Sequence, residues 1–281
     1  MAIGGSMSEQ GSGPSAQGRL GDEQARAAAR GQRQRLLVVV LGGVVAAAVV
    51  VAVVVVAVSR NSGGETFEDS YKGPLAPTTR EQYGAVAMAQ PGVTAPVLDL
   101  YEDFQCPACK LLEQRLGGTI KQLAAEGKVK VVYRPFQLFQ QDPLMSNSRR
   151  AANAAACVPA ERWVRYHDRL FAEQPVEGDR GFSNADLIDW GAEQGVADPA
   201  FAACVNGSQK IDLVEKASAQ AGRAGVDATP YLALNGRKIG AGALGSPDDL
   251  KKAVAAAAGA PAPAPGATRS DGTEIGADPA P

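Results

Sequence analysis

The sequence has few residues of the kinds that bind metal ions: four cysteines and one histidine. A structural zinc site needs four ligands, usually from two closely spaced cysteine pairs or from a cysteine pair and a histidine pair. Only Cys106 and Cys109 are closely spaced, because Cys157, Cys204 and His167 stand far apart in the sequence. Half of a zinc site is an alternative interpretation of the pair, but we expect no metal and no cofactor.

The sequence also lacks an excess of charge of either sign. The formal net charge is -2, and no basic patch stands out after residue 60. Proteins that bind nucleic acid concentrate positive charge on one face or segment. We therefore expect no nucleic acid partner.

One long apolar run, residues 36–58, contains no charged residue. At about 1.5 Å per residue, a helix of this length spans a hydrocarbon core of roughly 30 Å. Signal-peptide cores are shorter, so the run predicts a retained transmembrane helix, with cleavage near Ser59 or a buried core helix as alternatives. Five arginines precede the run and only Arg60 closely follows it. The positive-inside rule then places the N-terminus in the cytoplasm and the rest of the chain outside.

The closely spaced thiols, Cys106-Pro107-Ala108-Cys109, lie where a strand pattern at residues 96–104 changes to a helical pattern. Two thiols at this spacing can close and reopen a small disulfide ring. The positive end of the helix favours the thiolate of the first cysteine, and Pro107 suits the first helical position because it has no N–H. Outside the cytoplasm, where disulfides persist, the motif indicates thiol–disulfide exchange.

Composition divides the chain into five parts. We expect a disordered tail at 1–35, the transmembrane helix at 36–58, a polar linker at 59–83, one folded domain at 84–258 and an Ala/Pro-rich disordered tail at 259–281. Within the domain, strands are expected at 85–88, 96–104 and 128–136, with a helix between the last two that breaks at Gly117-Gly118. A helical block at about 142–225 follows, then a hairpin across Asn235-Gly236 and a last helix after Ser246.

Two motifs together resemble a known family. Residues 94–109, which end in Tyr-Glu-Asp-Phe-Gln-Cys-Pro-Ala-Cys, and residues 228–237, Ala-Thr-Pro-Tyr-Leu-Ala-Leu-Asn-Gly-Arg, are similar to those of the membrane-anchored DsbA-like thiol:disulfide oxidoreductases of actinobacteria, in the thioredoxin superfamily. The resemblance covers residues 84–258. It implies an α/β thioredoxin fold with an inserted helical subdomain, preceded here by a single N-terminal transmembrane helix.

The resemblance also implies roles for single residues. Cys106 would be the attacking thiol and Cys109 the resolving thiol, and Pro107 belongs to the active-site loop between them. Pro230 would be a cis-proline that faces the cysteines, preceded by Thr229, in a loop that binds an extended substrate peptide.

The sequence departs from the family pattern at two positions. Leu100 stands six residues before Cys106, where many members have a buried acid, and Glu102 or Asp103 could substitute for it. Ala108 replaces the basic or aromatic residue often found before the second cysteine of the active-site loop. Because of these two changes, the resemblance does not predict the redox potential of the cysteine pair.

The remaining two cysteines, Cys157 and Cys204, both lie in the helical block. Outside the cytosol they most simply pair with each other, which would contribute about 4 kcal/mol of stability in the chain-entropy model; a second redox relay is the alternative. His167 shares a helix face with Trp163 and Phe171, so we expect a packed core residue. A role near Cys106 would require the block to fold over the active site.

We therefore expect an extracytoplasmic enzyme that oxidises cysteines of secreted or envelope proteins through Cys106 and Cys109. The resemblance implies a membrane quinone-linked thiol oxidase as its reoxidant. The alternatives are a reductase or isomerase of extracytoplasmic disulfides, and a non-catalytic peptide-binding or chaperone module in which the thiols are incidental.

Overall fold

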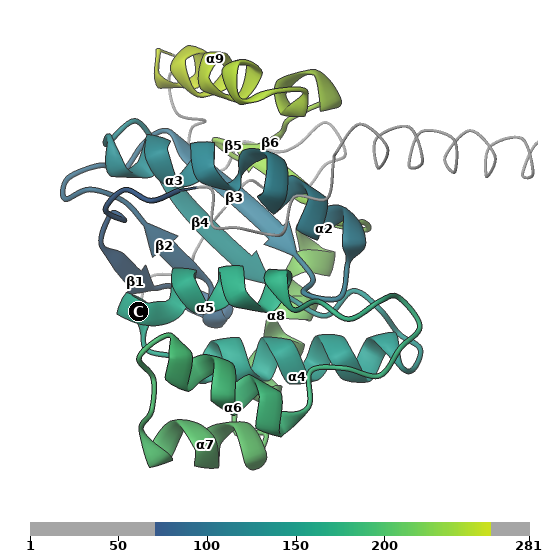
Figure 1. Ribbon diagram of the computed structural model, residues 1–281. Coiled ribbons are helices and arrows are strands. Elements are labelled where there is room, and N and C mark those ends of the chain that lie inside the picture. Colours follow the sequence, from purple (N-terminus) through teal and green to yellow (C-terminus); the bar gives the residue numbers. More distant parts are fainter. Residues whose placement is uncertain (1–70, 260–281) are drawn as a thin grey trace, which may run out of the picture. The chain divides into compact units, whose positions relative to one another are not determined.

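The computed structural model describes residues 71–259, in which helices pack around a central sheet (Figure 1). The tail predicted at 1–35 and the transmembrane helix predicted at 36–58 lie outside the described residues, as do residues 260–281. Within the described part of the chain, no helix is long and apolar enough to cross a membrane.

Six strands form one mixed sheet in the order β1-β2-β4-β3-β5-β6. They are β1 (Thr78–Arg80), β2 (Val86–Met88), β3 (Val97–Glu102), β4 (Lys130–Pro135), β5 (Tyr231–Leu234) and β6 (Arg237–Lys238). β3 and β4 are parallel, whereas every other neighbouring pair is antiparallel. A parallel pair needs a crossover connection, and the helical stretch after Cys106 supplies it.

The hairpin at the end of the sheet forms where the sequence predicts it. Asn235 and Gly236 both have positive φ, 50° and 74°, as a type I′ turn between β5 and β6 requires. Asn235 also ties the hairpin to β3, because its Oδ1 accepts a hydrogen bond of 2.9 Å from the N–H of Val97. The hairpin thereby fixes β5 beside the strand that leads to the thiol pair.

The crossover differs from the prediction of a helix broken at two glycines. α2 (Pro107–Leu112), the π-helical segment Glu113–Gly117 and α3 (Gly118–Ala125) follow one another without a break. Gly117 and Gly118 both have right-handed helical angles. The cost of glycine in a helix is only about 1 kcal/mol, and burial of Leu116 and Ile120 in the core outweighs it.

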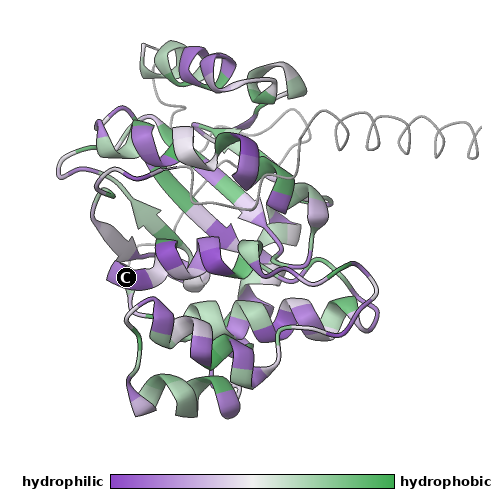
Figure 2. Cartoon of the chain, in the orientation of Figure 1, coloured by the Kyte–Doolittle hydropathy of each residue, from purple (hydrophilic) through white to green (hydrophobic). Residues whose placement is uncertain are grey.

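The helical block forms five helices: α4 (Leu144–Cys157), α5 (Ala160–Ala172), α6 (Asn184–Glu193), α7 (Pro199–Asn206) and α8 (Ile211–Arg223). Two of these helices begin with a side-chain cap, since Ser183 accepts from the N–H of Asp186 and Asp198 accepts from the N–H of Ala200. Figure 2 shows hydrophilic and hydrophobic residues alternating along the helices, which is typical of helices with one buried face.

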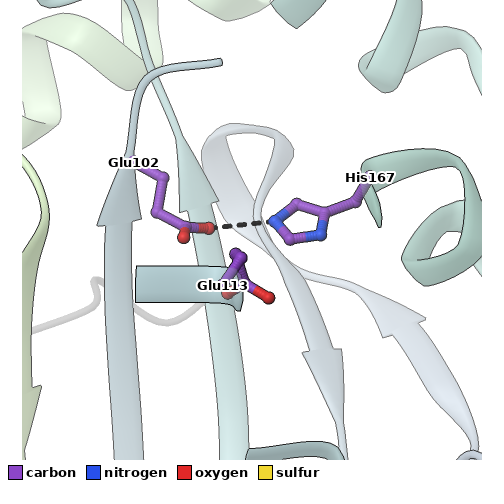
Figure 3. Close-up of side chains that lie close together, drawn as sticks. All are labelled: Glu102, Glu113 and His167. Atoms are coloured by element: carbon purple, nitrogen blue, oxygen red, sulfur yellow. Dashed lines mark hydrogen bonds and ion pairs between the residues drawn. The ribbon is translucent and has the colours of Figure 1, made fainter. Parts of the chain in front are cut away.

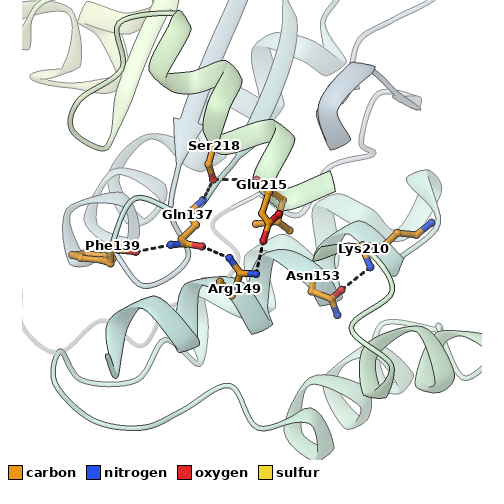
Figure 4. Close-up of polar contacts among 8 residues, drawn as sticks. Gln137, Phe139, Arg149, Asn153, Lys210, Glu215 and Ser218 are labelled. Atoms are coloured by element: carbon orange, nitrogen blue, oxygen red, sulfur yellow. Dashed lines mark hydrogen bonds and ion pairs between the residues drawn. The ribbon is translucent and has the colours of Figure 1, made fainter. Parts of the chain in front are cut away.

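Polar contacts fasten the block to the end of β4 (Figure 4). Arg149 on α4 donates to Gln137 Oε1 at 3.1 Å and to Glu215 Oε1 on α8 at 2.8 Å. The N–H of Gln137 donates in turn to Ser218 Oγ at 3.0 Å. The helical block therefore packs against the sheet and is part of the same folded unit.

The two faces of the sheet have separate hydrophobic cores. Leu98 and Leu100 of β3 belong to the larger core, together with residues of α3, α5 and the C-terminal helix α9 (Pro247–Ala258). Tyr101 points to the smaller core, which includes Ala221 of α8. Alternation along the strand then places Glu102 on the face that α5 covers, at the end of β3 where the thiol pair follows.

The folded part also begins earlier than predicted. Residues 59–83 were expected to form a linker, but Thr78–Arg80 form strand β1 and pair with β2. Ala76 is buried at 3% exposure. A three-residue strand with polar side chains carries too little periodicity to be recognised from sequence.

Candidate active site

The thiol pair lies at the N-terminus of α2, directly after β3. Cys106 caps the helix with extended backbone angles, and Pro107 occupies the first turn. The N–H groups of Cys109 and Lys110 both donate to the carbonyl of Cys106, at 3.1 and 3.3 Å. Both cysteines are free thiols in this structure, so it represents the reduced pair.

The two thiols differ in exposure and acidity. Cys106 is 6% exposed, whereas Cys109 is fully buried. A hydrogen bond from Cys109 lowers the pKa of Cys106 to about 6, with further lowering by Thr229 and by the backbone of Ala108 and Cys109, against the opposing effect of burial. Burial raises the pKa of Cys109 well above its usual value, and the neighbouring Cys106 and Glu102 raise it further. At neutral pH the pair is one thiolate beside one thiol.

The loop before β5 lies against Cys106. Tyr231 pairs with Tyr101 in the antiparallel β3–β5 ladder, so the start of β5 lies beside the end of β3. The Thr229-Pro230 peptide bond is cis. Cys106 Sγ lies 3.4 Å from the carbonyl oxygen of Thr229 and donates a hydrogen bond to it when the thiol is protonated. The two motifs that are distant in sequence therefore meet at the Cys106 sulfur.

Segments of the helical block also contact the thiol loop, and no sequence pattern predicts these contacts. Gln174, just after α5, donates from Nε2 to the carbonyls of Phe104 at 2.7 Å and Cys106 at 3.0 Å. Gln105 donates to the carbonyl of Pro175 at 3.2 Å. Asn147 on α4 donates to Gln105 Oε1 at 2.7 Å. The block thus folds beside the active site and fixes the backbone of the thiol loop.

The two acids that could replace the family's buried acid have different positions. Asp103 is buried and accepts hydrogen bonds from the N–H groups of Gln105 and Leu138 and from the Ser148 hydroxyl. It therefore organises the loops around the thiol pair. Glu102 points to the opposite face, where its charge acts on Cys109.

Glu102 belongs to a cluster of five buried charged residues, which we call the acid cluster. Its members are Glu102 of β3, Glu113 of the π-helical segment, Lys121 of α3, and His167 and Asp168 of α5. His167 Nε2 lies 3.0 Å from Glu102 Oε2 and Nδ1 lies 3.1 Å from Asp168 Oδ1. Figure 3 shows Glu102 and His167 facing each other with Glu113 beside them.

His167 is therefore buried in the core, as expected, but it is an ion-pair partner as well as a packed ring. Its ring contacts Tyr133, Trp163 and Phe171. Glu102, Glu113 and His167 place their ligand atoms within 4.8 Å of one another, a spacing that a cation site could use. However, Nε2 of His167 is already hydrogen-bonded to Glu102, and Lys121 supplies a positive charge 2.7 Å from Asp168. We therefore treat the acid cluster as an ion-pair network.

The other two cysteines form a disulfide. Cys157, the last residue of α4, is bonded to Cys204 on α7. The bridge joins two helices of the block.

Comparison with known proteins places this site in a family. The family model described as thioredoxin matches residues 92–256. The reduced disulfide bond oxidoreductase DsbG of Mycobacterium tuberculosis is 33% identical over 62% of this chain and 84% of that chain, with a TM-score of 0.53. Oxidised DsbA of the same organism is 31% identical over 66% of this chain and 93% of that chain, with a TM-score of 0.53.

This chain belongs to the thioredoxin superfamily and is DsbA-like. BdbD of Bacillus subtilis, at 18% identity and a TM-score of 0.56, shares the fold over 67% of this chain and 100% of its own length. No curated protein matches the sequence. The thioredoxin-like α/β fold expected from the two motifs is thereby confirmed.

Proposed function

We propose that this DsbA-like protein disulfide oxidoreductase forms disulfides in secreted or envelope proteins outside the cytoplasm. The observation that carries the proposal is the asymmetry of the thiol pair. Cys106 has a pKa of about 6 and lies at the helix start, whereas Cys109 is fully buried with a raised pKa. Cys106 is then the sulfur that bonds to substrate, and Cys109 the sulfur that resolves or leaves.

In the oxidising reaction, a substrate thiolate attacks Cys106 Sγ and breaks the Cys106–Cys109 bond. A second thiolate of the substrate attacks the mixed disulfide, which releases oxidised substrate and leaves the Cys106 thiolate. The carbonyl of Thr229 contacts the same sulfur, and Thr229 and Pro230 would receive the substrate backbone. Pro107 and Ala108 shape the loop, and the Cys157–Cys204 disulfide is structural.

The acidity of Cys106 supports oxidation as the direction. A lowered thiol pKa stabilises the reduced pair, which makes the disulfide a stronger oxidant. With a pKa of about 6 instead of about 9, the thiolate stabilises the reduced state by about 1.4 kcal/mol at pH 7, or about 30 mV. Reduction or isomerisation would need an electron donor instead.

The location belongs to the same proposal. The apolar run at 36–58 supports a single-pass anchor in the cell membrane, with a cytoplasmic tail at 1–35 and an extracytoplasmic domain that extends to residue 258. The segment from 59 to the first strand would be a linker, and residues 259–281 a tail. A membrane quinone-linked thiol oxidase would return the pair to its disulfide form.

The reduction potential of the Cys106–Cys109 pair tests the direction. The full chain is equilibrated in glutathione buffers, trapped with a thiol-alkylating reagent and analysed by mass spectrometry. We expect a value near the oxidising end, about -120 mV, whereas a value near -270 mV, like that of thioredoxin, would overturn oxidation. Cys106→Ser should abolish thiol oxidation, and activity that survives this substitution would favour the peptide-binding module.

A further inference from the structure

A surface cavity lies beside the start of α4. Its volume is about 460 Å³, and its lining comes from the residues at and just before the start of α4 and from the loop between α5 and α6: Asp142, Pro143, Ser146, Arg150, Gly178 and Arg180. Pockets that bind ligands usually have volumes of about 300–1,000 Å³. The cavity is therefore large enough to receive a side chain or a small molecule.

The lining carries more positive than negative charge. Burial lowers the pKa of Arg150 and the like charge of Arg180 lowers it further, although Asp142 opposes the shift, so the two guanidinium groups act on each other. Within residues 71–259, neither arginine forms an ion pair. Asp142 is the only acid in the lining, and its Oδ1 already accepts hydrogen bonds from the N–H and the hydroxyl of Ser146. One further negative charge would balance the cavity.

Arg150 is held in one orientation. Its Nε donates to the carbonyl of Phe182 at 2.9 Å, and its Nη2 donates to the carbonyl of Gly181 at 2.7 Å and to Asn147 Oδ1 at 2.6 Å. Its Nη1 makes no hydrogen bond to any residue that the structure describes. The planar N–H groups of a guanidinium match the oxygens of a carboxylate or phosphate, and little entropy is lost when the guanidinium is already fixed. Arg150 is therefore prepared to bind an oxyanion.

Arg180 and α4 add to the same potential. Arg180 is exposed, and its guanidinium makes no hydrogen bond within the described part of the chain, so it can turn toward a ligand. α4 has 14 residues and begins at the cavity. The positive end of its dipole therefore favours a negative charge there.

One buried residue connects this cavity to the thiol loop. Asn147 is fully buried, and its Oδ1 accepts hydrogen bonds from Arg150 and from the N–H of Gly181 at 3.1 Å. Its Nδ2 donates to Oε1 of Gln105, the residue that directly precedes Cys106. An extended polypeptide spans about 3.3 Å per residue. A substrate bonded to Cys106 therefore has to place only a few residues between its cysteine and the cavity.

We propose that Arg150 and Arg180 form a carboxylate-binding site for an aspartate or glutamate side chain of the substrate polypeptide, a few residues from the cysteine that reacts with Cys106. The proposal rests on the proposed function of the thiol pair and adds a substrate class to it, polypeptides with an acidic residue near a cysteine. Inorganic phosphate offers similar oxyanion chemistry, so the test has to separate the two sources.

Peptide oxidation tests the site on the full chain with its Cys106–Cys109 pair oxidised. Each peptide has two reduced cysteines in a Gly/Ser sequence and either Asp or Asn at one position, which is moved through the six residues on either side of the first cysteine. The rate constant of a single turnover is measured by acid quench and mass spectrometry. The Asp/Asn ratio of rate constants is then compared between chains, because the intrinsic effect of Asp on the peptide thiol cancels in this comparison.

The variants change the ratio in opposite directions. Arg180→Gln should lower it by about fivefold at one or more peptide positions, the upper range for a partly exposed ion pair, and Arg150→Gln should lower it as well. Asp142→Asn should raise it by about twofold or more, because asparagine can still cap α4 while the competing negative charge is removed. The control is Arg165→Gln on α5, which is exposed and outside the lining; it should leave the ratio unchanged.

Equal ratios in the unsubstituted chain, Arg180→Gln and Asp142→Asn would overturn the carboxylate site, even if Arg150→Gln fails to fold. If the unsubstituted chain oxidises no peptide, including the Asn peptides, the proposed function is overturned instead.

Inorganic phosphate separates the two sources of the anion. It should lower the Asp/Asn ratio more than sodium chloride does at the same ionic strength, because phosphate occupies the site whereas chloride acts by screening. An equal effect of both salts would show general charge attraction and overturn a built site. Calorimetric binding of phosphate that is lost in Arg180→Gln, without any preference for Asp peptides, would assign the site to a free anion and overturn the substrate assignment.

Discussion

Burial and the nearby charge of Glu102 raise the pKa of Glu113 to about 8. We therefore predict that the folded state is less stable at high pH than it would be without this acid. The folded pKa of about 8 lies above the unfolded value of about 4.5. A raised carboxyl pKa gives a stabilising contribution that is complete below the unfolded pKa and is lost as the pH rises through the folded pKa. Between these two values, the folded state holds one proton more than the unfolded state, so stability falls by about 1.4 kcal/mol per pH unit.

The substitution Glu113→Gln removes this pH dependence, because glutamine resembles the protonated acid and cannot ionise. Relative to the protein that keeps Glu113, we expect the unfolding free energy of the variant to be almost unchanged near pH 4.5, and to be higher by about 3 kcal/mol at pH 7 and by about 4 kcal/mol at pH 8. Urea unfolding at each pH measures the difference. A Cys106→Ser background keeps Cys109 as a thiol without reductant and leaves the Cys157–Cys204 disulfide intact.

The control is Glu126→Gln, since Glu126 is exposed. Its unfolding free energy should follow the curve of the background protein at every pH. If the Glu113→Gln curve also runs parallel to the background between pH 5 and 8, Glu113 does not hold a proton in the folded state. The raised pKa of Glu113 would then be wrong.

Two further predictions concern the cysteines. The alkylation rate of Cys106, measured by mass spectrometry, should rise with a midpoint near pH 6 and level off above pH 7, because the thiolate is the reactive form. Cys109 should stay unreactive across this range. A midpoint near pH 8.5 for Cys106 would contradict its lowered pKa. Replacing Cys157 and Cys204 together by alanine should lower the unfolding free energy by about 4 kcal/mol, because the disulfide joins residues with a sequence separation of 47. An unchanged midpoint of urea unfolding would show that the disulfide does not stabilise the fold.

Local rules predicted the parts of the site that consist of neighbouring residues. Cys106 to Cys109 at a helix start, the turn at Asn235-Gly236 and the start of the last helix after Ser246 all depend on a few adjacent residues. Alternation along β3 could also have placed Glu102 on the same face as Leu98 and Leu100. This alternation did not identify Glu102 as the buried acid, because no sequence pattern showed what that face of the strand packs against.

The acid cluster could not be predicted, since its members come from four elements that only the tertiary fold brings together. Glu102 and His167 are separated by 65 residues. Helical periodicity correctly placed His167 on the buried face of α5, but periodicity cannot distinguish an apolar neighbour from a buried carboxylate. The identity of the partner depends on how the inserted block packs on the sheet.

Gly117 shows how the acid cluster explains a sequence feature that was misread as a helix break. A Cβ at position 117 would overlap Oε2 of Glu113, so the glycine leaves the space that this carboxyl occupies. Gly117→Ala should therefore displace Glu113 and lower the unfolding free energy by about 1–3 kcal/mol, as overpacking does. The matched control is Gly222→Ala in α8, where an added Cβ meets nothing within 4 Å; it should stabilise the protein by about 0.5–1 kcal/mol through helix propensity. If both alanines stabilise equally, Gly117 does not make room for the buried acid, and the position of Glu113 in the acid cluster would need another explanation.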